Sequence, residues 1–204
     1  MASHCSDPSQ MPRHQLPQYL FAFDPGGMAT FRTLAMLSIN KDARSRVLDE
    51  LAAADAISAP QLSFLRACYL ESLRLWPTTP AILRETTQPV AWSEGQLDKG
   101  THVTIFAPFL HRDDETLPNA HSFDPSGWID VVVRPDAGLV PFSYGPVPCP
   151  AAHFVPMIAS LAMRRLLSRL DLRLTEPNRL SSGRLPGTLD NFTLSFVTSD
   201  QLTP

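Results

Sequence analysis

Three cysteines are the first candidates for chemistry in this sequence, and only Cys149 has unusual neighbours. Cys5 lies in a polar leader, and Cys68 falls in a helical pattern where a small, buried core residue is expected. An odd, sparse set of cysteines with no CxxC pair argues against a disulfide framework and against a zinc site. The chemistry that remains is that of a single reactive sulfur at Cys149.

Cys149 lies between a proline-rich loop and a strong helix pattern. A thiolate at the start of a helix is stabilised by free backbone N–H groups and by the helix dipole. We expect the amides of Ala151 and Ala152 to donate to this sulfur. Phe142 is expected to shield it from water, and Gly145 to let the loop turn tightly. The alternative is a buried core cysteine in a proline-rich loop.

Glu71 and Arg74 form an ExxR pattern on a helix that Pro77 ends. Residues three apart share one face of a helix, so the carboxylate and the guanidinium are expected to pair. The alternative for this pattern, taken alone, is a solvated surface ion pair.

The order of these features resembles that in the cytochrome P450 family of haem-thiolate monooxygenases. The ExxR helix is followed by residues 109–113 (FLHRD), residues 123–128 (FDPSGW) and the cysteine loop 141–151 (PFSYGPVPCPA). The loop matches the family's Phe-x-x-Gly-x-x-x-Cys-x-Gly motif at its phenylalanine, first glycine and cysteine. Residues 111–113 (HRD) also resemble a kinase catalytic loop, but no glycine-rich loop, DFG or fitting asparagine accompanies them.

Three positions depart from the family's motifs. Gly127 stands where the family usually has an arginine that joins the ExxR pair, and Arg134 is a candidate substitute. Val147 stands where an arginine or histidine often meets a haem propionate. Ala151 replaces the glycine that usually follows the cysteine by two residues.

The resemblance implies that the chain binds haem b, iron protoporphyrin IX. Cys149 would be the axial ligand of the iron, within a loop shaped by Phe142 and Gly145. An anionic sulfur ligand pushes electron density onto the iron and favours O–O cleavage. Glu71 and Arg74 would hold the core of the fold as a structural pair.

Two further residues take expected roles from the resemblance. Arg84 matches a position that often meets a haem propionate, and the alternative is an ordinary surface arginine on a strand. The first apolar helix resembles the family's central helix, where an acid followed by a threonine feeds protons to bound oxygen. Asp24 is the expected acid, or else a carboxylate stabilised by the helix dipole. Pro25 replaces the threonine and is expected to kink the helix.

The implied activity is insertion of one atom of O₂ into a small organic substrate. A separate electron-donor protein, a reductase or ferredoxin, would dock near Arg164 and Arg165. One alternative is a haem-thiolate enzyme that uses peroxide or acts as an isomerase, because Pro25 offers no hydroxyl. Another is a non-catalytic haem-binding fragment, because Cys149-Pro150 also resembles the Cys-Pro motif of proteins that bind haem reversibly.

Hydrophobic periodicity predicts an α+β chain, mostly α, to position these residues. Helices are expected at 19–39, at 41–54, from a capping box at Ser58 and Gln61 to Pro77, and at 151–170. Extended runs are expected at 81–86, 90–92, 101–106 and 189–197, with a turn at 97–100 and a long coil at 108–150. This order is the C-terminal half of the family's fold: a long central helix, the ExxR helix, a small β-sheet, the cysteine-ligand loop and a final long helix.

Composition limits the class of protein. With 44% hydrophobic and 18% charged residues, the 204-residue chain is expected to be globular, with a disordered leader at 1–18 and a partial haem domain at 19–204. A net charge of −3 gives no electrostatic footprint for nucleic acid or an anionic membrane. No spanning segment or secretory signal is seen, so a cytoplasmic location is expected. Because only half of the fold is matched, we expect a truncated fragment that binds haem poorly alone and aggregates.

Overall fold

The computed structural model describes residues 12–53, 62–129, 131–132, 134–181 and 183–200. Its elements confirm an α+β chain that is mostly α. The helices are α1 (Pro12–Ile39), α2 (Lys41–Ala53), α3 (Ser63–Leu75), α4 (Ala107–His111) and α5 (Phe154–Leu167). The strands are β1 (Ala81–Glu85), β2 (Val90–Trp92), β3 (Gly95–Leu97), β4 (His102–Phe106), β5 (Leu170–Leu174) and β6 (Phe196–Asp200). Short 3₁₀ turns lie in the connections: η4 (Pro125–Trp128), η5 (Pro135–Ala137), η6 (Pro177–Arg179) and η7 (Asn191–Thr193).

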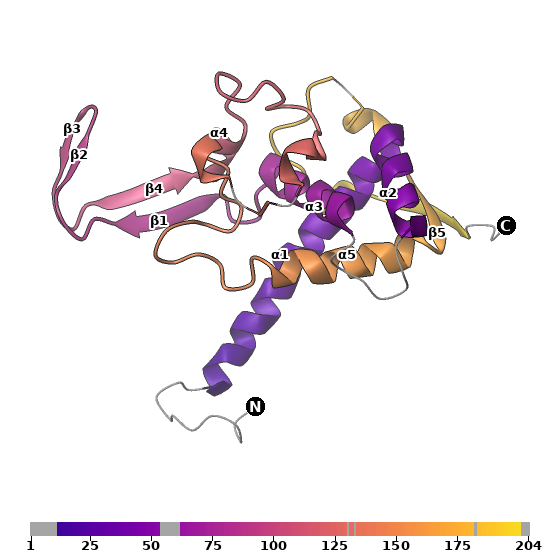
Figure 1. The fold of residues 1–204 in the computed structure, drawn as a ribbon, viewed down its shortest axis with the longest axis horizontal. Coiled ribbons are helices and arrows are strands. Elements are labelled where there is room, and N and C mark those ends of the chain that lie inside the picture. Colours follow the sequence, from indigo (N-terminus) through magenta and orange to yellow (C-terminus); the bar gives the residue numbers. More distant parts are fainter. Residues whose placement is uncertain (1–11, 54–61, 130, 133, 182, 201–204) are drawn as a thin grey trace.

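The helices gather in one body, and a β-hairpin extends from it (Figure 1). Helix α3 lies in the middle, where it packs against α1 and α5, which also pack against each other. Strands β1 and β4 pair antiparallel with Ala81 opposite Phe106, and the β2–β3 hairpin lies at their far end. Strands β5 and β6 pair antiparallel on the other side of the body. The extended runs predicted at 81–86, 90–92 and 101–106 therefore agree with β1, β2 and β4.

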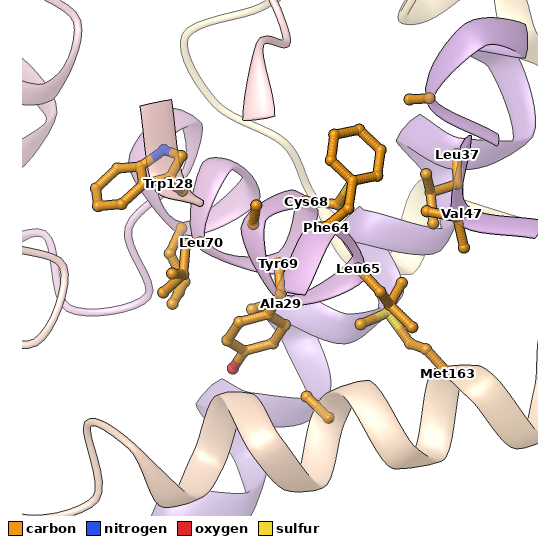
Figure 2. Close-up of a cluster of buried hydrophobic side chains, with 14 of the residues drawn as sticks. Ala29, Leu37, Val47, Phe64, Leu65, Cys68, Tyr69, Leu70, Trp128 and Met163 are labelled. Carbon is orange, nitrogen blue, oxygen red and sulfur yellow. The ribbon is translucent and has the colours of Figure 1, made fainter. Parts of the chain in front are cut away.

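Helix α3 forms the centre of the core. Every residue from Phe64 to Leu75 is buried except Arg66, as expected for a helix enclosed by protein on all sides. Figure 2 shows side chains of α3 meeting side chains from α1, α2, α5 and η4, among them Trp128 and Met163. Cys68 is among them with no exposed surface, which confirms the prediction of a small core residue.

The N-terminus of α3 is capped by a side chain from another helix. The capping box predicted at Ser58 and Gln61 lies outside the described residues, and α3 begins at Ser63. The Glu50 carboxylate on α2 accepts hydrogen bonds from the amides of Phe64 (2.7 Å) and Leu65 (2.9 Å). An acidic group at this end is favoured because the first amides of a helix lack partners within it.

Helix α1 begins earlier than predicted. Residues 12–18, assigned to the disordered leader, are helical from Pro12, a residue suited to the first turn because it has no N–H to satisfy. The helix continues through Pro17 and Pro25, and the bend expected at Pro25 stays a prediction. Cys5 lies outside the described residues. Among the described helices, none is both long enough and apolar enough to cross a membrane.

The C-terminal strand begins later than predicted. The run 189–197 was predicted to be a strand, whereas β6 follows a turn, η7. The Asp190 carboxylate accepts the amide of Phe192 at 3.0 Å and closes this turn. Leu189 and Leu194 on either side are buried, so apolar residues that resembled a strand face instead pack a turn against the core.

Candidate functional site

Glu71 and Arg74 form a buried, bidentate ion pair on α3. Arg74 Nη2 lies 2.6 Å from Glu71 Oε1, and Arg74 Nε donates to Glu71 Oε2 at 2.8 Å. The two side chains are only 1% and 2% exposed, so the alternative of a solvated surface pair is wrong. Arg74 also donates to four backbone carbonyls, those of His111, Asn119, Ala120 and Ser122. One guanidinium therefore ties α3 to α4 and to the segment that follows it.

The remaining hydrogen bonds to the Glu71 carboxylate come from the 123–128 segment. The amide of Asp124 donates to Oε1 at 2.9 Å, and the indole Nε1 of Trp128 donates to Oε2 at 2.8 Å. Burial raises the pKa of Glu71 above its ordinary value, while the hydrogen bonds from Arg74, Asp124 and Trp128 act to lower it. An indole N–H from Trp128 thus donates to the Glu71 carboxylate, for which the sequence analysis had expected arginine partners.

Arg134, the candidate substitute for the missing arginine, lies beside Gly127. Its Nη1 is 2.9 Å from the point that a Cβ on Gly127 would take, so the guanidinium occupies the space of the absent side chain. Within the described residues, the hydrogen bonds to Glu71 come from Arg74, Asp124 and Trp128. Arg134 therefore fills the space beside Gly127. The hydrogen bond to Glu71 comes instead from Trp128, the residue after Gly127, which the sequence analysis did not predict.

The cysteine loop is closed by backbone hydrogen bonds. The Cys149 amide donates to the Phe142 carbonyl at 2.8 Å, and the Ser143 amide donates to the Val140 carbonyl at 3.0 Å. Ser143 and Gly145 have φ angles of 64° and 86°, so the tight turn predicted at Gly145 is present. Phe142 is half-buried and packs against the main core cluster. These contacts fix the backbone on both sides of the turn.

The start of α5 differs from the prediction. The helix begins at Phe154, not at residue 151, and Cys149 is separated from it by a turn. The Ala152 amide donates to the Cys149 carbonyl at 3.2 Å, so the prediction that this amide serves the sulfur is wrong. Cys149 is a free cysteine with a partly exposed surface, unlike the buried core cysteine of the alternative.

Arg84 lies beside the same loop. On β1 it is paired in register with Val103, and its Nη2 donates to Ser143 Oγ and, at 3.4 Å, to the Tyr144 carbonyl. Its Nη1 donates to the Leu83 carbonyl at 2.9 Å. The structure therefore brings together Arg84, Phe142, Gly145 and Cys149, which the sequence had singled out separately.

Asp24 lies on α1, two residues before Gly26, a position at which this helix lies close to α5. A Cβ on Gly26 would lie 3.1 Å from Val155 Cγ1 and 3.9 Å from the Tyr69 hydroxyl. Burial raises the pKa of Tyr69, and the electrostatic influence of Cys149 raises it further. Asp24 itself is exposed.

A lone thiolate suits one kind of metal site. In the part of the chain that the structure describes, no group of three or more His, Cys, Asp or Glu side chains could hold a metal ion. A metal at Cys149 would need its other ligands from outside the described residues, as from a porphyrin, which supplies its own ring nitrogens. Tyr144, Val147 and Phe154 are exposed apolar side chains close to Cys149 in sequence, and they suit a flat apolar macrocycle. The donor set therefore fits haem.

Comparisons with known proteins identify the family that this chain resembles. The family described as "Cytochrome P450" matches residues 32–185. Cytochrome P450 4A6 of Oryctolagus cuniculus is 32% identical over 121 residues, which are 59% of this chain and 24% of that protein. Cytochrome P450 4g15 of Drosophila melanogaster is 29% identical over 152 residues, 67% of this chain and 25% of that protein. The chain thus spans about a quarter of the length of these relatives.

The same likeness holds in three dimensions. The crystal structure of a cytochrome P450 (CYP102L1) superposes with a TM-score of 0.72 at 20% sequence identity. The match covers 87% of this chain and 43% of that one. At this identity the comparison concerns the fold, and the arrangement of helices and small sheets is the one these two chains share.

Proposed function

Because the chain belongs to the cytochrome P450 family, we propose that it forms the cysteine-ligand part of a haem-thiolate oxidoreductase. The observation that carries the proposal is the surroundings of Cys149: a partly exposed cysteine on a loop closed by the Phe142 carbonyl and contacted by Arg84. The family implies haem as cofactor, and haem b is the form that we propose. When bound through a thiolate, haem iron activates O₂ or peroxide, since the anionic sulfur pushes electron density onto it.

The chain's own residues would hold and orient this group. Cys149 would supply the sulfur ligand, and the hydrogen bond from the Cys149 amide to the Phe142 carbonyl would hold the backbone that carries this sulfur. Phe142 would exclude water from one side, because its ring packs toward the core. Arg84 would meet a propionate, a task that Val147 leaves unfilled, and its guanidinium already lies at the loop. Asp24 would hold a proton at its carboxylate for delivery on the α1 side.

The wider reaction is proposed by family. We propose a small organic molecule as substrate, O₂ as co-substrate and a separate reductase or ferredoxin as electron donor. The donor would dock near the last turn of α5, which carries Arg164 and Arg165. The charge pattern gives no support for a nucleic-acid partner.

A second candidate is a haem-thiolate enzyme that uses peroxide. Pro25 in α1 offers no hydroxyl, and the next two hydroxyls along the helix, those of Thr30 and Thr33, are already hydrogen-bonded, Thr33 also to Ser72 Oγ on α3 at 3.0 Å. Thr30 Oγ1 donates to the Gly26 carbonyl at 2.7 Å, and Thr33 Oγ1 donates to the Ala29 carbonyl at 2.7 Å. Peroxide brings its own oxygen and electrons, so a reaction with it needs less proton delivery from this helix. Turnover with peroxide in the absence of any reductase would favour this candidate.

The test is the optical spectrum of the full chain after titration with haem, reduction and addition of carbon monoxide. We expect a thiolate-type spectrum, with weak binding, because the chain spans about a quarter of the length of these relatives. Cys149→Ser should abolish that spectrum, whereas Cys68→Ser, which alters a buried core thiol, should leave it unchanged. A histidine-type spectrum in the unmodified chain, or a thiolate-type spectrum in Cys149→Ser, would overturn the proposal.

A further inference from the structure

His111 lies between the buried ion pair and the cysteine loop. It is the last residue of α4 and has no exposed surface. The backbone amide of Val140 donates to its Nε2 at 3.0 Å. Val140 directly precedes the loop that carries Cys149. The His111 side chain on α4 therefore accepts a backbone hydrogen bond from the residue directly before the cysteine loop.

His111 is itself held from the other side. Arg74 Nη1 donates to the His111 carbonyl at 2.8 Å, and Arg74 is bound to Glu71 by the bidentate pair. The backbone of His111 is thus tied to α3 and its ring to the loop. This gives a continuous path of short hydrogen bonds from Glu71 to Val140.

The proton on the ring is fixed by this geometry. A backbone N–H only donates, so Nε2 carries no proton and the neutral ring bears it on Nδ1. Nδ1 is buried and has no hydrogen-bond partner among the described residues. An unpaired buried N–H destabilises the folded chain. An apolar residue here would remove that group, but it would also leave the amide of Val140 without an acceptor.

The Val140 peptide determines where the loop begins. Its amide is fixed by His111, and its carbonyl accepts the amide of Ser143, a residue with a φ of 64°. The intervening Phe142 offers its carbonyl to the amide of Cys149. These hydrogen bonds link Val140 to Ser143 and Phe142 to Cys149. A shift of Val140 would therefore move the Phe142 carbonyl, which accepts the amide of Cys149.

We propose that His111 is a positioning residue for the Cys149 loop, acting through its Nε2 bond to the Val140 amide. The role of the loop in holding iron rests on the proposed function, whereas the His111–Val140 contact does not. His111 is not a catalytic residue, since it would touch neither the substrate nor the iron. Its contribution is to restrict the loop to one conformation.

Three substitutions in the full chain distinguish the effect of losing the Nε2 acceptor from the effect of changing the side-chain volume at position 111. His111→Leu removes the acceptor, His111→Gln keeps an acceptor at the reach of Nε2, and His111→Asn keeps a polar group only at the reach of Nδ1. The measurement is amide hydrogen exchange over residues 140–149, with the β5–β6 pair as an internal reference. We expect exchange to rise about tenfold or more in His111→Leu and His111→Asn, and to stay within about threefold in His111→Gln.

Alkylation of Cys149, followed by mapping of the modified peptide, gives a second measurement. We expect faster alkylation in His111→Leu and His111→Asn, because a loosened loop exposes the sulfur more often. Equal behaviour of His111→Gln and His111→Asn, in both measurements, would overturn the inference. If His111→Leu does not fold, this comparison of Gln with Asn decides the question, because both introduce a polar group of similar kind.

Neither measurement requires haem, so the two proposals fail separately. One outcome is that the chain shows no thiolate-type spectrum, while loop exchange and Cys149 alkylation stay near the unmodified values only in His111→Gln. This outcome would overturn the proposed function and leave His111 as a positioning residue. A thiolate-type spectrum that is identical in His111→Gln and His111→Asn, with equal exchange in both, sinks the role of His111 and leaves the proposed function.

Discussion

The indole Nε1 of Trp128 donates to Glu71 Oε2 at 2.8 Å, and both side chains are only 1% exposed. Trp128 follows Gly127, the position at which an arginine was expected from the resemblance, so an uncharged donor serves the carboxylate here. The guanidinium of Arg134 takes the vacated space, while within the described residues the hydrogen bonds to Glu71 come from Arg74, Asp124 and Trp128.

Trp128→Phe should therefore destabilise the fold although the ring remains. The change leaves one lone pair of the buried Glu71 carboxylate without its donor, and a loss of about 1–3 kcal/mol in the free energy of unfolding is expected. Denaturant-induced unfolding measures this value. Trp92→Phe is the matched control, because Trp92 is 62% exposed on β2. Equal losses in the two variants would show that the hydrogen bond to Glu71 contributes nothing specific.

The Glu71–Arg74 pair should be far more sensitive than a partly exposed pair of the same kind. Glu71→Gln keeps the shape of the side chain but leaves the charge of Arg74 buried without its partner, so a loss of about 3–5 kcal/mol is expected. In the Arg44–Asp171 pair the side chains are 19% and 25% exposed. Asp171→Asn should lose only about 0–1 kcal/mol. Similar values for the two variants, from the same denaturant titrations, would contradict the central role assigned to Glu71.

Much of this site follows from local patterns in the sequence. The spacing of Glu71 and Arg74 predicts their pairing because three residues bring side chains to one helix face, and the pair is present. Period-two runs predict β1 and β4, and a glycine predicts the positive φ at Gly145. These features depend on neighbours within a few residues, so a single sequence carries them.

The parts that the sequence did not reveal depend on contacts between distant segments. Glu50 caps α3 from α2, and Trp128 reaches a carboxylate 57 positions earlier in the chain. His111 belongs to a segment noted for its resemblance, but its bond to Val140 spans 29 positions. No local sequence pattern identifies these hydrogen-bond partners, since any residue with a suitable polar group could occupy the position. Packing decides which one does.

The stability of the fold should fall with acidity through His111. Burial first, and the positive charge of Arg74 second, lower the pKa of His111 to about 4. In the unfolded chain this side chain titrates near its ordinary value of about 6.5. Between these values the unfolded chain binds a proton that the folded chain does not, so stability is full above about pH 6.5 and is lost as pH falls toward about 4. The lost amount should approach about 3 kcal/mol and then level off.

Unfolding titrations from pH 7 to pH 4 measure this effect as a difference between the unmodified chain and His111→Gln. The carboxylates titrate in both proteins, so their contribution cancels when the two curves are subtracted. The difference should grow as pH falls, with the unmodified chain losing more. A difference that is constant over the whole range would show that His111 titrates alike in the folded and unfolded chains.

Two glycine substitutions should have opposite effects on stability. Gly145 has a φ of 86°, a conformation that L-residues adopt only with strain, so Gly145→Ala should destabilise the fold by about 1 kcal/mol. Gly27 lies within α1, and a Cβ there would meet nothing within 4 Å, so Gly27→Ala should stabilise the fold by up to about 1 kcal/mol. Both values come from denaturant unfolding, and Cys149 alkylation should quicken only in Gly145→Ala, because only that change disturbs the turn before the cysteine. If Gly145→Ala were as stable as the unmodified chain, with Cys149 reacting at the same rate, the loop would not require the left-handed turn.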